Sequence, residues 1–302
     1  MTQIDKSRFE WIGSDSARRE GISRPSTTFW KDAIGRLMKN KVAVVCFFII
    51  VLLILSCIIV PFFSPFESRE QHLGEVNKGF MTVCTDPRYE GQHHVHYFGT
   101  DNLGRDLFLR AFEGGRVSLM IAFAAVFVNL IVGLIYGGIS GYIGGAVDTI
   151  MMRIVEIVNG IPYLIVVILL MMVLPKGIFT MVVAYGITGW TGMARLVRGQ
   201  VLQLKSQEYI VAAEAMGAKS SRIIAKHLIP NALSVIIINV TLAIPSAIFT
   251  EAFLSYIGLG VPVPQPSWGV LAKGGQDVFM TYPYQLVVPA VALSLIHISE
   301  PT

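Results

Sequence analysis

The stretch Glu208–Asn231, EYIVAAEAMGAKSSRIIAKHLIPN, is a polar interruption between two strongly apolar segments. Its first half is rich in alanine and ends at Gly217, its second half carries basic residues, and Pro230 and Asn231 close it. A membrane chain has little reason to place such a segment between two spans unless something outside the bilayer contacts it. We therefore expect the stretch to dock on a separate protein.

The first half of this stretch predicts a short helix over residues 207–216. Ser206 is suited to cap its N-terminus, and Glu208 lies in the first turn, where the helix dipole favours an acid. Gly217 follows as the residue that ends the helix, because glycine adopts the left-handed conformation of a C-terminal cap without steric cost.

The second half predicts another helix, capped by Ser220 or Ser221 and reaching about Leu228, after which Pro230 begins the next span. The two helices would meet at an angle and offer apolar side chains to a partner's groove, namely Ile210, Val211, Ala213, Ile223, Ile224 and Leu228. The alternative is an ordinary amphipathic loop that rests on the lipid surface.

The whole composition indicates a membrane protein. Of 302 residues, 53% are hydrophobic and 15% are charged, whereas soluble domains carry about 25% charged residues. Several apolar runs approach the roughly 20 residues that cross a hydrocarbon core as a helix. The fold class is therefore all-α, a polytopic helical membrane protein.

The apolar runs predict six spans, at residues 42–63, 117–143, 150–174, 178–194, 232–250 and 284–298. The last run is short for a full crossing. We divide the chain into an N-terminal tail (1–41), the first span (42–63), an outer loop (64–116), a core membrane domain (117–298) containing the segment 195–231, and an atypical tail (299–302).

Charge placement predicts the orientation of the chain. The tail holds nine Lys or Arg against five acids, and residues 195–231 hold six against two. Because basic residues concentrate on the cytoplasmic side, both segments are expected in the cytoplasm and residues 64–116 outside it. The outer stretch 251–283, rich in Gly and Pro, is expected to re-enter the membrane partly or to cap the outer mouth.

The outer loop contains Cys84, His93, His94 and His96, a set of residue types that bind metals. Their spacing fits no standard zinc pattern, so we expect a solvated loop and no metal site. A disulfide at Cys84 is not expected, because no second cysteine lies in the loop. Cys46 and Cys57 lie inside the first apolar run and are expected to be packing residues.

Two patterns in the core predict local contacts. Glycines recur every four residues at Gly133, Gly137, Gly141 and Gly145, which places a ridge without side chains along one helix face for close packing of another helix. Arg153 and Glu156 are three residues apart on one helix face and can pair. Asn159, Gly160 and Pro162 then loosen that helix.

The polar interruption resembles the cytoplasmic loop of binding-protein-dependent ABC importer permeases. That family's pattern is Glu-Ala-Ala, three residues, Gly, and about nine residues before Ile-x-x-Pro. The corresponding residues here are Val211-Ala212-Ala213, Glu214-Ala215-Met216, Gly217 and His227-Leu228-Ile229-Pro230. Val211 replaces the family's Glu, which weakens the case for a charge contact there, and His227 stands where Ile is expected.

Other stretches resemble the C-type subunit of dipeptide and oligopeptide permeases, and the resemblance covers about residues 30–295. They are Tyr97-Phe98-Gly99-Thr100-Asp101-Asn102-Leu103-Gly104-Arg105-Asp106, Gly115-Arg116-Val117-Ser118-Leu119, Ser255-Tyr256-Ile257-Gly258-Leu259-Gly260 and Pro266-Ser267-Trp268-Gly269. The chain's last residues, Leu295–Thr302, do not look like the family's continuation, and we expect the final span to be incomplete.

The resemblance implies a six-span type I ABC importer transmembrane domain in the bacterial inner membrane that imports di- and oligopeptides. It implies a second homologous permease subunit, two cytoplasmic ATP-binding subunits that use ATP and Mg²⁺, and an external peptide-binding protein, with no nucleic acid. It places the contact to the ATPase on Tyr209, Val211, Ala212, Ala213, Glu214, Gly217, Ile224, His227 and Pro230.

This chain is not expected to be an enzyme or to bind a cofactor, because no Gly-x-x-x-x-Gly-Lys phosphate loop occurs in it. The alternatives are an ABC permease for nickel or another small solute, a stand-alone secondary transporter, and a non-transporting scaffold. No inverted repeat favours the secondary transporter. Candidate polar residues for a translocation pathway at membrane depth are Asn129, Glu156, Asn159 and Asn239.

Overall fold

The computed structural model describes residues 34–35, 37–87 and 94–297. The predicted N-terminal tail lies mostly outside these residues, and His93 and the tail 299–302 lie entirely outside them. The chain divides into two compact units between Phe47 and Phe48, inside helix α2 (Lys41–Phe63). The packing described below belongs to the unit that begins at Phe48.

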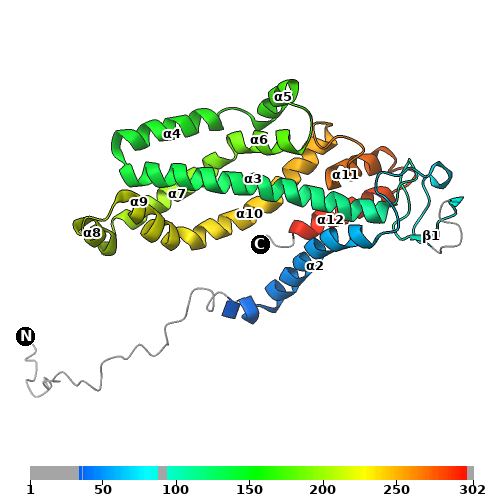
Figure 1. The fold of residues 1–302 in the computed structure, drawn as a ribbon, viewed down its shortest axis with the longest axis horizontal. Coiled ribbons are helices and arrows are strands. Elements are labelled where there is room, and N and C mark those ends of the chain that lie inside the picture. Colours follow the sequence, from blue (N-terminus) through cyan, green and yellow to red (C-terminus); the bar gives the residue numbers. More distant parts are fainter. Residues whose placement is uncertain (1–33, 36, 88–93, 298–302) are drawn as a thin grey trace, which may run out of the picture. The chain divides into compact units, whose positions relative to one another are not determined.

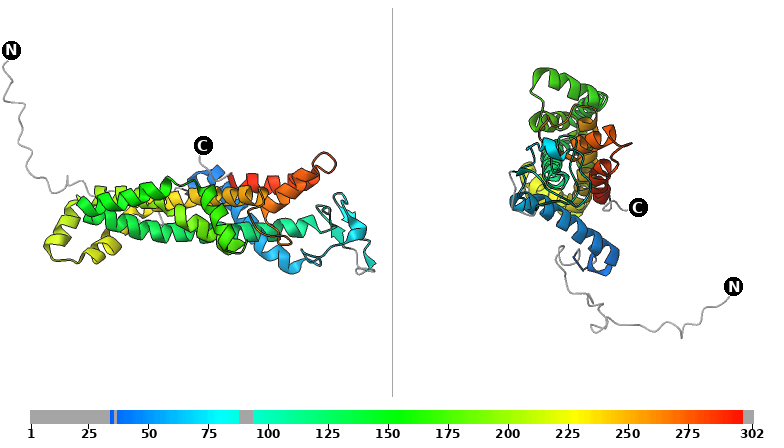
Figure 2. Two further views of the ribbon diagram at one scale, coloured as in Figure 1. Left: turned by 90° about the horizontal axis from the view of Figure 1, so that it is seen from above. Right: turned by 90° about the vertical axis from the view of Figure 1, so that its right-hand side faces the viewer.

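The described part of the chain is mostly helical, as predicted. Its main helices after α2 are α3 (Leu107–Ile143), α4 (Gly145–Asn159), α5 (Tyr163–Val173), α6 (Ile178–Thr188), α7 (Trp190–Lys205), α10 (Ile229–Tyr256), α11 (Trp268–Asp277) and α12 (Tyr284–His297). Figure 1 shows α3, α7 and α10 running beside one another. The short helices α8 and α9 lie at one end of α3, and the outer loop with strand β1 lies at the other end (Figures 1 and 2).

Three described helices are long and apolar enough to cross a membrane, namely Lys41–Phe63, Leu107–Ile143 and the continuous stretch Ser220–Tyr256. A fourth crossing results if α4 and α5 form one span, although they are bent by 76° at their junction. The predicted loosening by Gly160 and Pro162 lies at this bend. The predicted fourth span is also broken, since α6 ends before Gly189 and α7 begins after it.

The predicted glycine ridge packs against α7. A Cβ atom on Gly137 would lie 2.3 Å from the carbonyl oxygen of Ala194, and one on Gly133 would lie 2.5 Å from the Met193 side chain. Gly141 likewise faces backbone of α7 at Arg198. Gly145 is the exception, because it follows the turn at Gly144 and belongs to α4, so the ridge has three members.

The outer stretch after α10 folds back on the core. Helix α11 packs against α10, α12 and α3. Its first residue, Trp268, is 1% exposed and donates a hydrogen bond from its indole Nε1 to the carbonyl of Ala111, at 2.9 Å. Trp268 and Cys57 belong to the same buried cluster, so Cys57 is a packing residue, as predicted.

The outer loop is not the solvated loop that the sequence led us to expect. A 3₁₀ turn (Leu73–Glu75) and two short antiparallel strands, β1 (Thr82–Val83) and β2 (Val95–His96), give it a fixed structure in the described residues. Cys84 and His96 are buried in it. The loop ends at Asp106, whose carboxylate caps α3 by accepting a hydrogen bond from the Leu109 backbone N–H at 2.7 Å.

Candidate functional site

The segment between α7 and α10 begins with helix α8 (Glu208–Ala215), as the sequence predicted. It ends at Gly217, whose φ is +76°. The Gly217 N–H donates to the Glu214 carbonyl at 2.9 Å, and the Ala218 N–H donates to the Ala213 carbonyl at 3.1 Å. These two bonds form a Schellman cap, which confirms Gly217 as the C-terminal stop.

The predicted serine caps of this segment are wrong. The N-cap of α8 is Gln207, with no side-chain cap, and the Ser206 hydroxyl instead donates back to the Gln203 carbonyl at 3.1 Å. The N-cap of α9 (Ser220–Ile223) is Lys219, again without a side-chain bond. The extended conformation of Gln207 and Lys219 therefore starts these helices without help from a hydroxyl.

The second half is not a separate helix but the beginning of α10. Helix α9 continues through one π-helical turn, η5 (Ile224–Leu228), directly into α10. The wide turn has a local cause: because Pro230 has no N–H, it cannot donate a helical hydrogen bond to a carbonyl of the preceding turn. The Asn231 side chain then donates to the His227 carbonyl at 2.6 Å and satisfies an acceptor at that position.

The apolar side chains of the segment mostly face their own chain, contrary to the prediction that a partner's groove receives them. Ile210, Ile223 and Leu228 are fully buried in a cluster with Val197 and Val201 of α7. Ala213 is buried as well, and Ile224 is half-buried. The apolar side of α8 therefore anchors this helix to α7.

A polar cluster holds α8 from its other side. The Tyr142 hydroxyl, at the end of α3, donates to the Glu214 carboxylate at 3.0 Å. The Lys205 ammonium donates to the Tyr142 carbonyl at 2.5 Å and lies 5.1 Å from the centre of its ring. Glu214 thereby ties α8 to Tyr142 at the end of α3, and Lys205 ties the end of α7 to the same tyrosine.

Most of α8 and the turn after it remains exposed, including Glu208, Glu214 and Ala215. We call the exposed residues Tyr209, Val211, Ala212, Met216 and Gly217 the α8 surface. Val211 is 55% exposed and Met216 is 82% exposed. Of the other residues predicted for contact, Pro230 is exposed and His227 is half-buried, on the stretch where η5 joins α10. A short helix that is anchored by buried residues and exposes apolar side chains such as Val211 and Met216 is suited to insertion into a groove of another protein.

Helices α3, α4 and α7 are joined around an ion pair that was not predicted from the sequence. The Arg198 guanidinium donates to both carboxylate oxygens of Asp148 at 2.5 Å, and the Ser140 hydroxyl donates to the same carboxylate. One bidentate pair thus connects α3, α4 and α7. The residues are 50 positions apart, and no spacing rule links them.

We expect Arg198→Ala to lower the free energy of unfolding of the purified chain by about 1–3 kcal/mol, because it leaves a mostly buried carboxylate without its charge partner. Denaturant unfolding in mild detergent measures this. Arg153→Ala is the matched control: Arg153 and Glu156 pair at 2.7 Å as predicted, but both side chains are more than half exposed, so the change should cost less than about 1 kcal/mol. Equal effects of the two variants would contradict the expectation.

The four candidate pathway residues do not gather into one site. Asn129 is buried beside Gly189, and Asn159 accepts a hydrogen bond from Thr191 at 3.4 Å, so these two lie near the break between α6 and α7. Glu156 is exposed and bound to Arg153. Asn239 lies half-buried on α10. A pathway through these residues remains a prediction.

Three of the stretches that carried the family resemblance, those containing Ser118, Ser255 and Ser267, meet around one buried carboxylate that was not predicted from the sequence. Glu251 of α10 accepts hydrogen bonds from Ser118 of α3 at 2.6 Å and from Ser255 at 2.7 Å. The Ser267 hydroxyl approaches that of Ser255 at 3.4 Å, and the Trp268 N–H donates to Ser118 at 3.2 Å. The carboxylate therefore joins α3, α10 and the start of α11.

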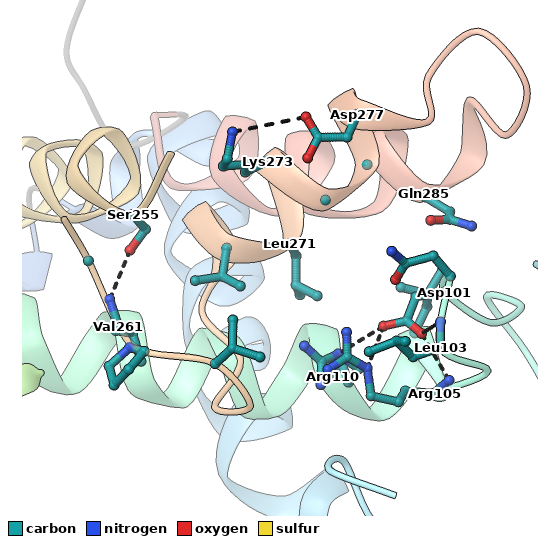
Figure 3. A pocket seen from close by; sticks show the side chains of 18 of the residues that line it. Asp101, Leu103, Arg105, Arg110, Ser255, Val261, Leu271, Lys273, Asp277 and Gln285 are labelled. Atoms are coloured by element: carbon teal, nitrogen blue, oxygen red, sulfur yellow. Dashed lines mark hydrogen bonds and ion pairs between the residues drawn. The ribbon is translucent and has the colours of Figure 1, made fainter. Parts of the chain in front are cut away.

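A cavity of about 520 Å³ opens beside this junction, between the outer loop, the start of α3 and α11 (Figure 3). Charged residues line it, among them Asp101, Arg105, Arg110 and Lys273. Arg105 donates to Asp101 at 2.7 Å, and Arg110 donates to the Ser68 carbonyl at 2.8 Å. The motif Tyr97–Asp106 thus supplies part of the wall of this outer cavity.

The comparisons with known proteins bear on the whole chain. Residues 130–299, more than half of the chain, match the family described as "Binding-protein-dependent transport system inner membrane component". The chain belongs to this family. Residues 28–79 also match the "N-terminal TM domain of oligopeptide transport permease C". The chain is therefore a multi-pass membrane protein of a transport family, and the predicted resemblance is confirmed.

Several transport permeases are similar to nearly the whole length of this chain. The oligopeptide transport system permease protein OppC of Bacillus subtilis (strain 168) is 48% identical, over 96% of this chain and 91% of that protein. The dipeptide transport system permease protein DppC of the same strain is 45% identical, over 91% of this chain and 83% of that protein. OppC of Escherichia coli (strain K12) is 41% identical, over 95% of this chain and 91% of that protein.

A solved structure shows the fold. An inward-facing form of the MetNI methionine ABC transporter superposes with a TM-score of 0.52 and 20% identity, over 63% of this chain and 91% of that chain. The architecture predicted from the sequence, an ABC importer transmembrane domain, is confirmed for that part of the chain.

Proposed function

We propose that this protein is the permease subunit of an ATP-driven importer that moves di- or oligopeptides across the bacterial inner membrane. Nearly full-length similarity to oligopeptide and dipeptide permeases carries the assignment of the substrate class. The subunit pairs with a second, homologous permease, and an external binding protein delivers the peptide. Two separate ATP-binding subunits hydrolyse ATP with Mg²⁺, since this chain has no phosphate loop.

The α8 surface is the contact to one ATP-binding subunit. Its support is the geometry: Val211 and Met216 point outward, whereas Ile210 and Ala213 on the opposite side are packed into the permease. A force applied to α8 is therefore transmitted to α7 through packed side chains and to α3 through the Glu214–Tyr142 hydrogen bond. Because six basic residues in 195–231 oppose two acidic ones, this end lies in the cytoplasm, together with the N-terminus.

Co-purification of the ATP-binding subunits tests this contact. We expect Val211→Asp to lower the amount of ATPase bound per permease at least about tenfold, because it places a charge in the centre of an apolar contact. Val263→Asp is the matched control, since Val263 is 71% exposed and lies in the outer stretch between α10 and α11. Its ATPase content should remain that of the wild type.

An undiminished ATPase content in Val211→Asp would refute the proposed contact. The substrate class is tested separately by peptide-stimulated ATP hydrolysis in the reconstituted complex. Stimulation by nickel or another small solute, and not by peptides, would overturn the peptide assignment while leaving the contact in place.

A further inference from the structure

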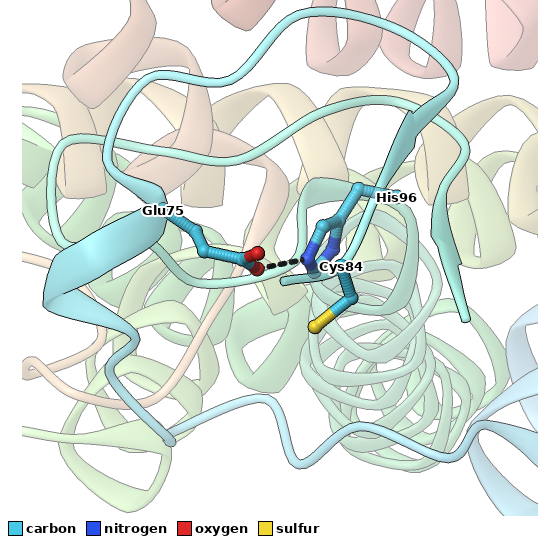
Figure 4. Close-up of side chains that lie close together, drawn as sticks. All are labelled: Glu75, Cys84 and His96. Atoms are coloured by element: carbon cyan, nitrogen blue, oxygen red, sulfur yellow. Dashed lines mark hydrogen bonds and ion pairs between the residues drawn. The ribbon is translucent and has the colours of Figure 1, made fainter. Parts of the chain in front are cut away.

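The outer loop brings together three side chains of types that commonly bind transition metals. They lie at the end of α3 opposite α8 (Figure 1). Glu75 comes from the 3₁₀ turn, Cys84 follows β1, and His96 ends β2, and they face one another in Figure 4. One ligand atom from each lies within 4.8 Å of the others. The ligand atoms of a tetrahedral zinc ion, with bonds of about 2.0–2.3 Å, lie about 3.3–3.8 Å apart. An approach of up to about 1 Å between the three ligand atoms would give the cluster these dimensions.

These three side chains are shielded from water. Glu75 is 2% exposed, His96 is 0% exposed and Cys84 is 9% exposed. The Phe66 ring stacks on the His96 ring with 4.5 Å between the centroids, and Phe66, Cys84 and Leu109 form a small apolar cluster. A dry apolar surround of this kind strengthens the binding of a cation to its ligands.

A further carboxylate orients the histidine. His96 Nε2 lies 2.8 Å from Glu75 Oε2, and His96 Nδ1 lies 2.7 Å from Asp106 Oδ2. Metal-bound histidines commonly donate their second N–H to a carboxylate, which fixes the ring and makes it a better ligand. Asp106 fills that position, and the other oxygen of Glu75 is held by the Thr85 hydroxyl at 3.0 Å.

Protons compete with a cation for the ligand atoms of this cluster. Although burial opposes protonation of His96, its hydrogen bonds to Asp106 and Glu75 raise its pKa. Burial opposes the charge on Glu75 too, but hydrogen bonds from the Thr85 backbone and from His96 hold its pKa below the usual range. Burial raises the pKa of the Cys84 thiol to about 11, and a bound cation would displace its proton.

We propose that Glu75, Cys84 and His96 form a binding site for a transition-metal cation of the zinc type in the extracytoplasmic loop. A thiolate and an imidazole favour zinc over the calcium and magnesium ions that oxygen ligands select. Binding replaces the Cys84 S–H and His96 Nε2–H bonds by bonds to the ion and releases both protons. Three protein ligands leave a fourth tetrahedral position open. The ion would bind the 3₁₀ turn, the strand pair and, through Asp106, the start of α3 to one another.

The test uses the full-length chain in lipid nanodiscs, reduced and freed of metal with a chelator. Added Co²⁺ should give a thiolate-to-cobalt charge-transfer absorption that saturates at one ion per chain and disappears when Zn²⁺ displaces it. Cys84→Ser should abolish this absorption, and Glu75→Gln should weaken Zn²⁺ binding at least about tenfold. Asp106→Asn keeps a capping oxygen for α3 but should weaken binding by about 10- to 100-fold.

Two matched variants serve as controls. His94→Ala removes a histidine next to β2, and Cys46→Ser removes a thiol of α2; neither should change the absorption or the affinity for Zn²⁺. Circular dichroism and gel filtration verify that each variant is folded. If the wild-type chain shows no charge transfer, the proposal is overturned whatever the variants do. An absorption that survives in Cys84→Ser overturns it as well, because the ion would then lie elsewhere.

Discussion

Replacing Gly137 with leucine should prevent the chain from folding stably, or lower its free energy of unfolding by about 3 kcal/mol or more. A Cβ atom at this position would lie 2.3 Å from the Ala194 carbonyl oxygen. Because that atom belongs to the backbone of α7 and cannot rotate away, the two helices must move apart. Overpacking that shifts side chains and backbone costs about 1–3 kcal/mol and occasionally more, and we expect the upper end here because two helix backbones must separate.

Denaturant unfolding of the purified chain in mild detergent measures this effect against two variants. Gly137→Ala should be intermediate, since it adds only the clashing atom. Gly199→Leu is the control, because a Cβ atom on Gly199 meets nothing within 4 Å and leucine favours a helix more than glycine does. If Gly137→Leu proves as stable as Gly199→Leu, the close contact between α3 and α7 does not exist.

The second large effect is expected at Trp268, which attaches α11 to the core. Its indole ring is buried, and the backbone at Gly115 leaves room for it, since a Cβ atom there would lie 2.6 Å from the ring. Trp268→Ala removes the ring and the hydrogen bond to Ala111 and should cost about 3–5 kcal/mol. In the assembled importer, peptide uptake should fall, because α11 forms one wall of the outer cavity.

Unfolding by denaturant again provides the measurement, with two comparisons. Trp268→Phe keeps most of the ring but leaves the Ala111 carbonyl without its indole donor, so we expect a loss of about 1–3 kcal/mol. Phe179→Ala removes an aromatic ring that is 68% exposed on α6 and should change stability little in detergent. A loss for Phe179→Ala as large as that for Trp268→Ala would contradict the assignment.

Features encoded by neighbouring residues could be predicted from the sequence. Apolar runs located the three long membrane helices α2, α3 and α10. Gly217 marked the end of α8, and the Arg153–Glu156 pair followed from helical spacing. The glycines every four residues predicted close packing, and α7 occupies the ridge. Each of these features depends on the repeat of one helix or on the conformational freedom of one residue.

Features that depend on contacts between distant segments were missed. Glu75 lies 21 positions from His96, and Ser118 lies 133 positions from Glu251, so no periodic pattern links them. The short outer strands carry too few residues for an alternating pattern to show. The direction of the apolar face of α8 was wrong for a similar reason, because the sequence does not show that α7 supplies a complementary surface for Ile210.

Helix α3 runs without interruption from Leu107, directly after its N-cap Asp106, to Ile143. At 1.5 Å per residue, its 37 residues measure about 55 Å, well beyond the roughly 30 Å of a hydrocarbon core. For a helix of this length, a tilt of about 10° around its midpoint would move each end by roughly 5 Å in opposite directions. The outer loop is attached to the start of α3 through Asp106, and α8 is attached to its end through Tyr142. A tilt of α3 would therefore move the outer loop and α8 together, on opposite sides of the membrane.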